Sequence, residues 1–159
     1  MRAGVAACVL LLVAVGCRPD APPSDGVVEH VVDGDTVDVV LGDRHERVRL
    51  IGIDTPEVYV RDGPPECYGP EASAYTKQLL PEGTPVRLER DVVGRDDYGR
   101  LLAYVYLAAD GRMVNELIVA TGFAQPLTIP PNSTFASRFV AAARDAEAAG
   151  LGLWSACGG

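Results

Sequence analysis

The stretch of sequence that decides the fold is residues 27–53, which read VVEHVVDGDTVDVVLGDRHERVRLIGI. Its valine-rich segments alternate apolar and polar residues, and such alternation is typical of strands that bury one face. The dipeptides Asp33-Gly34 and Gly42-Asp43 favour tight turns. The stretch therefore predicts a β-meander of three strands, over residues 27–32, 36–41 and 46–53.

A first helix and two more strands are predicted beyond the meander. A loop rich in Gly and Pro covers residues 58–69, and residues 70–80 have Pro and an acidic residue where a helix would make its first turn. Residues 85–90 and 101–107 have the apolar composition of strands. The sequence thus predicts five strands.

Two further helices are predicted near the C-terminus. Residues 113–121 carry apolar side chains at helical spacing and stop at Gly122. The last helix ends at Gly150, and its candidate N-terminal caps are Asn132, Ser133 and Thr134. We expect the residues after it to dock on the core, namely Leu151, Leu153 and Trp154.

Residues 1–16 are predicted to be a signal peptide. Arg2 precedes an uncharged apolar run that is too short for a membrane span of about 20 residues. The run ends in Ala14-Val15-Gly16-Cys17, which resembles a bacterial lipobox, although Ala14 stands where Leu is usual. We expect lipidation at Cys17, with ordinary cleavage near the same point as the alternative.

The mature chain would then begin with a tether and continue as a single domain. Residues 17–25 are rich in Pro and polar side chains, which suits a short extended linker. The remaining residues, 26–159, are long enough for one packed core. The expected location is outside the cytoplasm, anchored to a membrane by lipid only, with secretion as a soluble protein as the alternative.

Two cysteines, Cys67 and Cys157, lie in the predicted domain, residues 26–159. One pair of cysteines in an exported domain predicts one disulfide. Because it would close a long loop, the chain-entropy model gives it a stabilisation of roughly 3 to 5 kcal/mol. The alternative is two unrelated buried thiols.

Charged residues gather in three segments where hydrophobic strands end: residues 33–36, 49–57 and 96–100. Taken singly, each segment is typical of a turn or a strand terminator. Phosphodiester chemistry needs a hard cation held by oxygen ligands, a group that positions water, and cations that neutralise the phosphate. The three segments together supply all of these.

At these segments the chain resembles the staphylococcal nuclease (thermonuclease) family, from about Val27 to Trp154. The motifs that carry the resemblance stand in family order: Asp-Gly-Asp-Thr at 33–36, Arg-Leu-(x3)-Asp-Thr-Pro-Glu at 49–57, Tyr-Gly-Pro-Glu-Ala at 68–72, Asp-x-Tyr-Gly-Arg-x-Leu-Ala-Tyr at 96–104, Met-Val-Asn-Glu at 113–116 and Leu-Trp-Ser at 153–155. The resemblance implies an α+β fold, mainly β, in which three helices flank a five-stranded OB-fold barrel. It also implies a nuclease that acts on DNA and RNA.

The resemblance implies that Asp35, Asp54 and the carbonyl oxygen of Thr55 bind one Ca²⁺, with water in the remaining positions. Plain strand alternation would place Arg49 and Asp54 on opposite faces, because they are five residues apart. The site therefore requires a bend or bulge, for which Gly52 is the candidate.

The resemblance further implies that Glu57 is the general base or orients the attacking water. Arg49 and Arg100 would grip the scissile phosphate, since guanidinium groups bind oxyanions through paired hydrogen bonds. Tyr98 would contact a neighbouring phosphate. The expected products end in 3′-phosphate. A salt-bridge role for either arginine is the structural alternative.

Two departures from the family concern substrate binding. The segment 125–131 is one residue shorter and lacks the pair of tyrosines that stack on a base. Asp97 replaces a lysine, and the net charge is −8 where the family prototype is basic. We therefore expect slow association with nucleic acid and a shallow dependence of substrate affinity on NaCl.

The sequence bears on two other classes of protein besides a nuclease. One is a catalytically weak or inactive OB-fold module that binds nucleic acid at the cell envelope; its expected signature, loss of Glu57 or of an arginine, is absent. The other is an EF-hand, which the sequence excludes because Asp33-Gly34-Asp35 lacks the required Gly and terminal Glu of the loop. A monomer is the expected oligomeric state.

Overall fold

The structure of the protein, a computed structural model, describes residues 25–158. The predicted signal peptide, Cys17 and nearly all of the tether lie outside the described residues. None of the helices in the described part is long and apolar enough to cross a bilayer.

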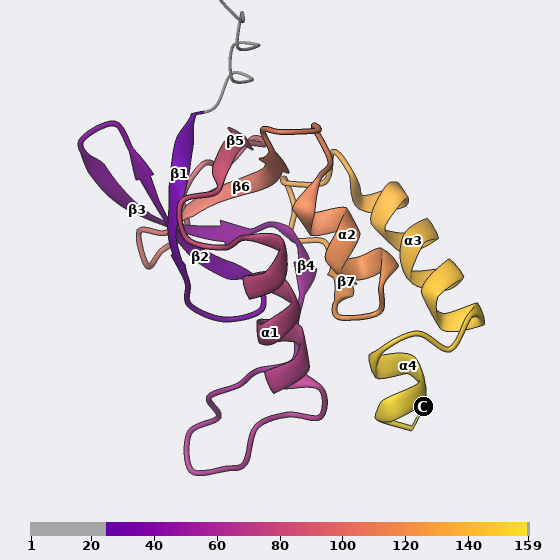
Figure 1. Cartoon of the computed structure of the whole chain (residues 1–159). Helices are drawn as coiled ribbons and strands as arrows, with labels where there is room; N and C mark the ends of the chain where they lie inside the picture. Colours follow the sequence, from indigo (N-terminus) through magenta and orange to yellow (C-terminus); the bar gives the residue numbers. More distant parts are fainter. Residues whose placement is uncertain (1–24, 159) are drawn as a thin grey trace, which may run out of the picture.

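Five strands form a closed barrel in the order β1-β2-β3-β6-β5, which confirms the predicted fold class (Figure 1). Neighbouring strands run antiparallel except β3 and β6, which are parallel. The barrel strands are β1 (Gly26–Val31), β2 (Thr36–Leu41), β3 (Arg44–Leu50), β5 (Pro85–Glu89) and β6 (Leu101–Leu107).

The predicted third strand, residues 46–53, is wrong in one respect, because it divides in two. After β3 the chain turns at Ile51 and continues as β4 (Gly52–Asp54), which pairs with β7 (Gln125–Leu127) outside the barrel. Gly52 has a φ of 81°, and a Cβ there would overlap the ring of Phe139. Only glycine adopts this backbone while leaving room for that ring.

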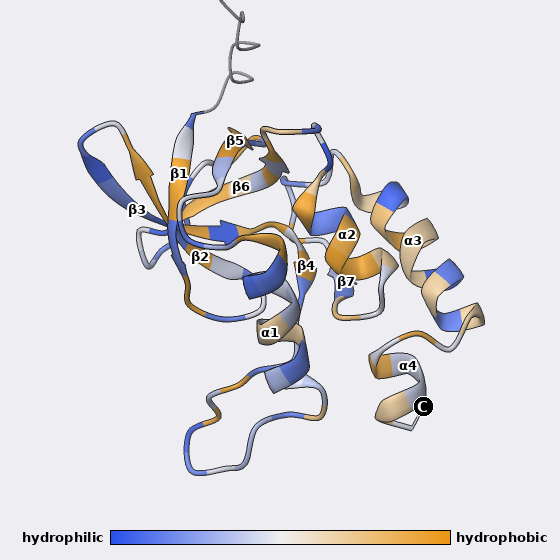
Figure 2. Ribbon diagram, viewed as in Figure 1, coloured by the Kyte–Doolittle hydropathy of each residue, from blue (hydrophilic) through white to orange (hydrophobic). Residues whose placement is uncertain are grey.

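The barrel interior is filled by side chains from alternating strand positions. Val37 and Val39 on β2, and Val48 and Leu50 on β3, are fully buried. Each such side chain contributes roughly 1.5 to 3 kcal/mol when it leaves water. Hydrophilic residues gather at the tip of the β2–β3 hairpin, which projects beyond the barrel (Figure 2).

Helices cover the barrel, and the three predicted ones are present: α1 (Gly69–Leu79), α2 (Val114–Ala120) and α3 (Ala136–Ala148). A short fourth helix, α4 (Leu153–Ala156), lies at the C-terminus. The hydroxyl of Thr76 on α1 donates a 2.6 Å hydrogen bond to the carbonyl of Gly34, which fixes the β1–β2 turn. α2 and α3 pack side by side on the other flank (Figure 1).

The predicted caps of α3 are wrong. Phe135 precedes the helix, and no side chain caps it. Asn132 instead accepts from the N–H and donates to the C=O of Val93, at 2.8 and 2.9 Å. The hydroxyl of Thr134 donates to Asp91. Asn132 and Thr134 thus form hydrogen bonds with the connection between β5 and β6, which lies far away in sequence. Local sequence patterns do not indicate such partners.

The C-terminal segment is held by the predicted disulfide between Cys67 and Cys157, whose Cα atoms are 5.8 Å apart. Leu153 is buried and Trp154 packs against the core, as expected. Leu151 does not dock there, because its side chain remains 42% exposed.

Candidate active site

Arg49 lies between two of the predicted calcium ligands. Its Nη1 atom is 2.9 Å from Oδ2 of Asp35, and its Nη2 atom is 2.9 Å from Oδ1 of Asp54. The break in the strand at Gly52 is what lets residues five apart in sequence face each other, and it satisfies the requirement for a bend. One guanidinium group therefore bridges both carboxylates.

The same guanidinium group is also tied to the backbone. Its Nη1 atom donates to the carbonyl oxygens of Leu50 and Ile53, at 2.8 and 3.1 Å. The buried amide of Asn115 on α2 supports this corner, since it donates to the carbonyl of Ile51 at 2.9 Å. The backbone around Arg49 is thus fixed from inside the fold.

Asp35 is a buried carboxylate with several donors. The N–H and the hydroxyl of Thr55 donate to its Oδ2 atom at 3.0 and 3.1 Å. Burial raises the pKa of Asp35 to about 6, although Arg49 and the hydrogen bonds from Thr55 lower it. A buried carboxylate of this kind is stabilised by a nearby cation.

These residues fit a hard divalent cation. Asp35 and Asp54 converge on one cationic group, and carboxylate and carbonyl oxygens are the ligands that Ca²⁺ prefers. Within residues 25–158, no cluster of three or more His, Cys, Asp or Glu side chains is arranged to hold a metal. Two carboxylates and one carbonyl oxygen would leave the remaining coordination positions of such a cation to water.

Glu57 lies just beyond Thr55 with its side chain at the surface. Partial burial raises its pKa, and the negative charges of Asp33, Asp54 and Glu66 act in the same direction, whereas Arg49 lowers it. Glu57 is thus within electrostatic reach of the Arg49 cluster. A carboxylate with a raised pKa beside a cation site is suited to accept a proton.

Arg49 and Arg100 line one groove, of about 400 Å³. The structure thereby brings together the two arginines that the sequence predicts. Arg100 is less enclosed than Arg49: its Nε atom is 2.6 Å from Oδ2 of Asp96, and its side chain is 33% exposed. Tyr98, which is 87% exposed, lies at the rim, and the Arg100 guanidinium is 5.6 Å from the centre of its ring.

Aliphatic residues also line this groove. Leu127 and Ile129 are exposed there, next to the Pro130-Pro131 dipeptide, and Asp97 also lines the groove. Tyr98 is the only aromatic side chain among the described residues that line it. The groove thus lacks the pair of tyrosines, as the shortened segment 125–131 predicts.

The motifs and the geometry agree with known proteins. The profile of the family described as "Staphylococcal nuclease homologue" matches residues 47–156. The chain belongs to the staphylococcal nuclease family.

Relatives in this family bear out the assignment over most of the chain. The chain is 39% identical over 128 residues to the thermonuclease of Staphylococcus intermedius, a match that covers 80% of this chain and 74% of that protein. It is 38% identical over 128 residues, with the same coverage, to the thermonuclease of Staphylococcus hyicus. It is 35% identical to the endonuclease YncB of Bacillus subtilis strain 168, over 82% of this chain and 62% of that protein.

Two acidic residues of this family member take part in the site, although sequence reasoning assigned them no role. Asp96 accepts hydrogen bonds from the backbone N–H groups of Tyr98 and Arg100 as well as from the Arg100 side chain. Glu66 accepts a hydrogen bond from the N–H of Glu57. Asp96 sits two residues before Tyr98, a spacing typical of a side chain that closes a turn. The partner of Glu66 is nine residues away, and no local pattern indicates it.

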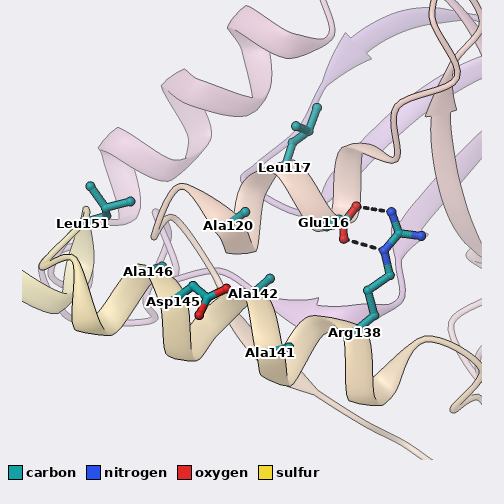
Figure 3. Close-up of a pocket in the computed structure, with 9 residues that line it drawn as sticks. All are labelled: Glu116, Leu117, Ala120, Arg138, Ala141, Ala142, Asp145, Ala146 and Leu151. Carbon is teal, nitrogen blue, oxygen red and sulfur yellow. Dashed lines mark hydrogen bonds and ion pairs between the residues drawn. The ribbon is translucent and has the colours of Figure 1, made fainter.

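A second hollow, of about 530 Å³, lies between α2 and α3, away from these residues (Figure 3). Ala120, Ala141 and Ala142 line it, and the ion pair between Glu116 and Arg138 stands at one end (Figure 3). None of the predicted site residues lines it.

Proposed function

We propose that the protein is an exported, Ca²⁺-dependent nuclease that hydrolyses phosphodiester bonds in DNA and RNA. Its similarity to thermonucleases and to an endonuclease supports nuclease activity. The observation that carries the finer proposal is the position of Arg49, which touches Asp35 and Asp54 and lines the groove with Arg100.

The two arginines, which both line the groove, would bind the scissile phosphate there. Arg49 is held by backbone carbonyls and would offer its remaining N–H donors without reorganisation. Arg100 would close on the phosphate from the β5–β6 loop. Fixed donors aimed at the charge that grows on phosphorus-bound oxygens are worth several kcal/mol to such a reaction.

Ca²⁺ would be held by Asp35, Asp54 and the carbonyl oxygen of Thr55, and when bound it supplies positive charge that polarises the phosphate. Glu57 would take a proton from the attacking water, or orient that water, at its carboxylate. Its raised pKa brings it closer to the range in which a carboxylate accepts a proton efficiently. Departure of the 5′ oxygen would leave 3′-phosphate ends.

The first test is hydrolysis of single-stranded DNA by the purified protein, in Ca²⁺ or in EGTA. The proposal expects cutting only with Ca²⁺, and a fall in kcat of about 10² to 10⁴ fold in Glu57→Ala. Glu82→Ala, which removes an exposed glutamate from a turn, is the matched control. Product ends are read with a 3′-phosphatase.

Two outcomes would count against the proposal in different ways. Products that carry 5′-phosphate would refute the polarity and leave the metal site standing. DNA that binds without being cut, in Ca²⁺, would favour the alternative of a nucleic-acid-binding module.

The exported location rests on the predicted leader. A disulfide between Cys67 and Cys157 is compatible with an oxidising compartment outside the cytoplasm. We expect the native protein to partition with membranes through Cys17, and Cys17→Ala to release it into the soluble fraction. Recovery of the native protein wholly in the culture fluid would support secretion without an anchor.

A further inference from the structure

Glu57 is held in place by its backbone, and the residue that holds it is Glu66. The N–H of Glu57 donates to Oε2 of Glu66 at 2.9 Å. In return, the N–H of Glu66 donates to the carbonyl of Glu57, also at 2.9 Å. These reciprocal bonds close the loop between β4 and α1, which hangs away from the barrel (Figure 1).

The N-terminus of α1 covers the same peptide group. Gly69 approaches so closely that a Cβ there would lie 2.5 Å from the carbonyl oxygen of Glu57. The N–H of Gly69 in turn donates to the carbonyl of Glu66, at 3.0 Å. Glu57 is therefore enclosed by backbone on one side while its own side chain faces solvent.

The residues that follow Glu66 are anchored to distant parts of the fold. Cys67 forms the disulfide with Cys157, at the C-terminal end of the chain. The ring of Tyr68 stacks on Phe123, with the ring centres 5.2 Å apart. By contrast, the outer part of the loop is exposed, and Tyr59 is 83% exposed. The fixed part of the loop is thus the part that touches Glu57.

We propose that Glu66 is a positioning residue for Glu57, and that the Cys67–Cys157 disulfide holds Glu66 in place for that task. The proposal rests on the proposed function, in which Glu57 acts on the attacking water. A displacement of about 1 Å at such a group costs on the order of 10² fold in rate. One hydrogen bond between two surface residues would then have a large effect on kcat and a small one on substrate binding.

The test compares Glu66→Ala with Glu66→Gln, because a glutamine oxygen still accepts the hydrogen bond from Glu57. With saturating Ca²⁺ and single-stranded DNA, we expect kcat to fall roughly 10 to 100 fold in Glu66→Ala, with KM changed by less than about 3 fold. Glu66→Gln should retain kcat within about 3 fold. Glu82→Ala should match the wild type.

A double variant separates positioning from a general loss of structure. If Glu66 acts through Glu57, the Glu57→Ala/Glu66→Ala variant is no slower than Glu57→Ala alone. Losses that multiply would overturn the proposal, as would equal losses of kcat in Glu66→Ala and Glu66→Gln.

The disulfide is tested with Cys67→Ser/Cys157→Ser, assayed at a temperature where circular dichroism shows it folded. We expect kcat to fall about 10 fold, and Glu66→Ala to add little in this background. A folded double-serine variant with the kcat of the wild type would remove the disulfide from the proposal.

Amide hydrogen exchange by NMR gives a readout that needs no activity. The Glu57 amide should exchange slowly in the wild type and in Glu66→Gln, and at least about 10 fold faster in Glu66→Ala. Unchanged exchange in Glu66→Ala would refute the positioning role. If the wild type cuts no DNA but this pattern holds, the proposed function fails and the hydrogen bond between Glu66 and Glu57 stands.

Discussion

The two arginines of the groove lie in contrasting surroundings. Arg49 is 15% exposed and contacts two carboxylates and two backbone carbonyls at the junction of β3 and β4. Arg100 is 33% exposed, extends from a loop, and pairs with Asp96 alone among the described residues. The same type of side chain is therefore held by several partners, the buried Asp35 among them, in one place and by one partly exposed carboxylate in the other.

This difference in surroundings predicts different effects on stability and on catalysis when each arginine is removed. Removing Arg49 would leave the buried Asp35 without its cation, so the fold and the site would suffer together. Removing Arg100 would leave Asp96, which still accepts two backbone hydrogen bonds at the surface. We therefore expect a substitution of Arg49 to lower stability and activity together, and a substitution of Arg100 to lower activity alone.

The largest expected effect is that of Arg49→Ala. Breaking a buried ion pair by removing one partner costs about 3 to 5 kcal/mol, since the other charge stays buried. We expect a loss of that order in the free energy of unfolding, measured by urea denaturation in EGTA, and loss of detectable DNA cutting.

Arg47→Ala is the matched control for this loss. Arg47 lies two residues earlier on β3 and pairs with Asp38 through two hydrogen bonds, but it is 52% exposed. Exposed pairs contribute roughly 0 to 1 kcal/mol. Equal destabilisation by the two variants would contradict the distinction between the buried Arg49 and the exposed Arg47.

Arg100→Ala is expected to affect activity alone. Loss of one donor to the charged phosphate lowers kcat by about 10² to 10³ fold. Its pair with Asp96 is partly exposed, so the free energy of unfolding should change by less than about 1 kcal/mol. Urea denaturation and single-stranded DNA hydrolysis measured on the same preparation check both halves. A loss of stability as large as that of Arg49→Ala would show that Arg100 also stabilises the fold.

The carboxylates that hold the two arginines should respond to pH with opposite signs. Burial raises the pKa of Asp35 from 3.8 to about 6, so between these values the folded protein binds a proton that the unfolded chain has released. The contribution of Asp35 to stability therefore declines as pH rises through this window, by roughly 3 kcal/mol at most.

Asp96 behaves in the opposite way. Burial raises its pKa, but hydrogen bonds from Arg100 and from the backbone outweigh burial and lower it. Its contribution is present above the ordinary carboxyl pKa and is lost as pH falls through the lowered value.

Urea denaturation in EGTA between pH 4 and 7 tests the raised pKa of Asp35. The plot of unfolding free energy against pH should be flatter for Asp35→Asn than for the wild type. Parallel curves would contradict the raised pKa.

The barrel was predictable from the sequence because its signals are local. Asp33-Gly34 marks a turn wherever it stands between valine-rich strands, and β6 (Leu101–Leu107) follows the predicted bounds. The family motifs supply Arg49 and Asp54 in order, and the structure pairs the Arg49 guanidinium with the Asp54 carboxylate beside the groove that Arg49 lines.

What the sequence did not reveal depends on partners far along the chain. The sequence marks Gly52 as the candidate for a bend, but the fit of its positive φ to the ring of Phe139 on α3 is visible only in the fold. Asn132 leaves the cap position for the backbone of Val93 for the same reason. Glu66 accepts a hydrogen bond from the N–H of Glu57, nine residues earlier, a pairing for which the loop sequence carries no local signal.

The smallest expected effect concerns Ile129, one of the aliphatic residues that line the groove. Ile129 is 65% exposed beside Pro130 and Pro131, so a larger side chain has room there. A tyrosine would offer a flat surface on which a base can stack, an interaction worth about 1 to 3 kcal/mol per base. Since Asp97 lines the same groove and repels phosphate, we expect the lower end of this range in Ile129→Tyr.

That lower end corresponds to a fall in KM for single-stranded DNA of about 5 fold with kcat unchanged, because stacking contributes equally to the ground state and the transition state. Ile129→Leu, which conserves volume without a ring, should leave KM unchanged. If KM fell in both variants, area of contact rather than stacking would limit substrate binding. A change in kcat instead would show that Ile129 affects the reaction step, as Arg49 is expected to do, and not substrate binding alone.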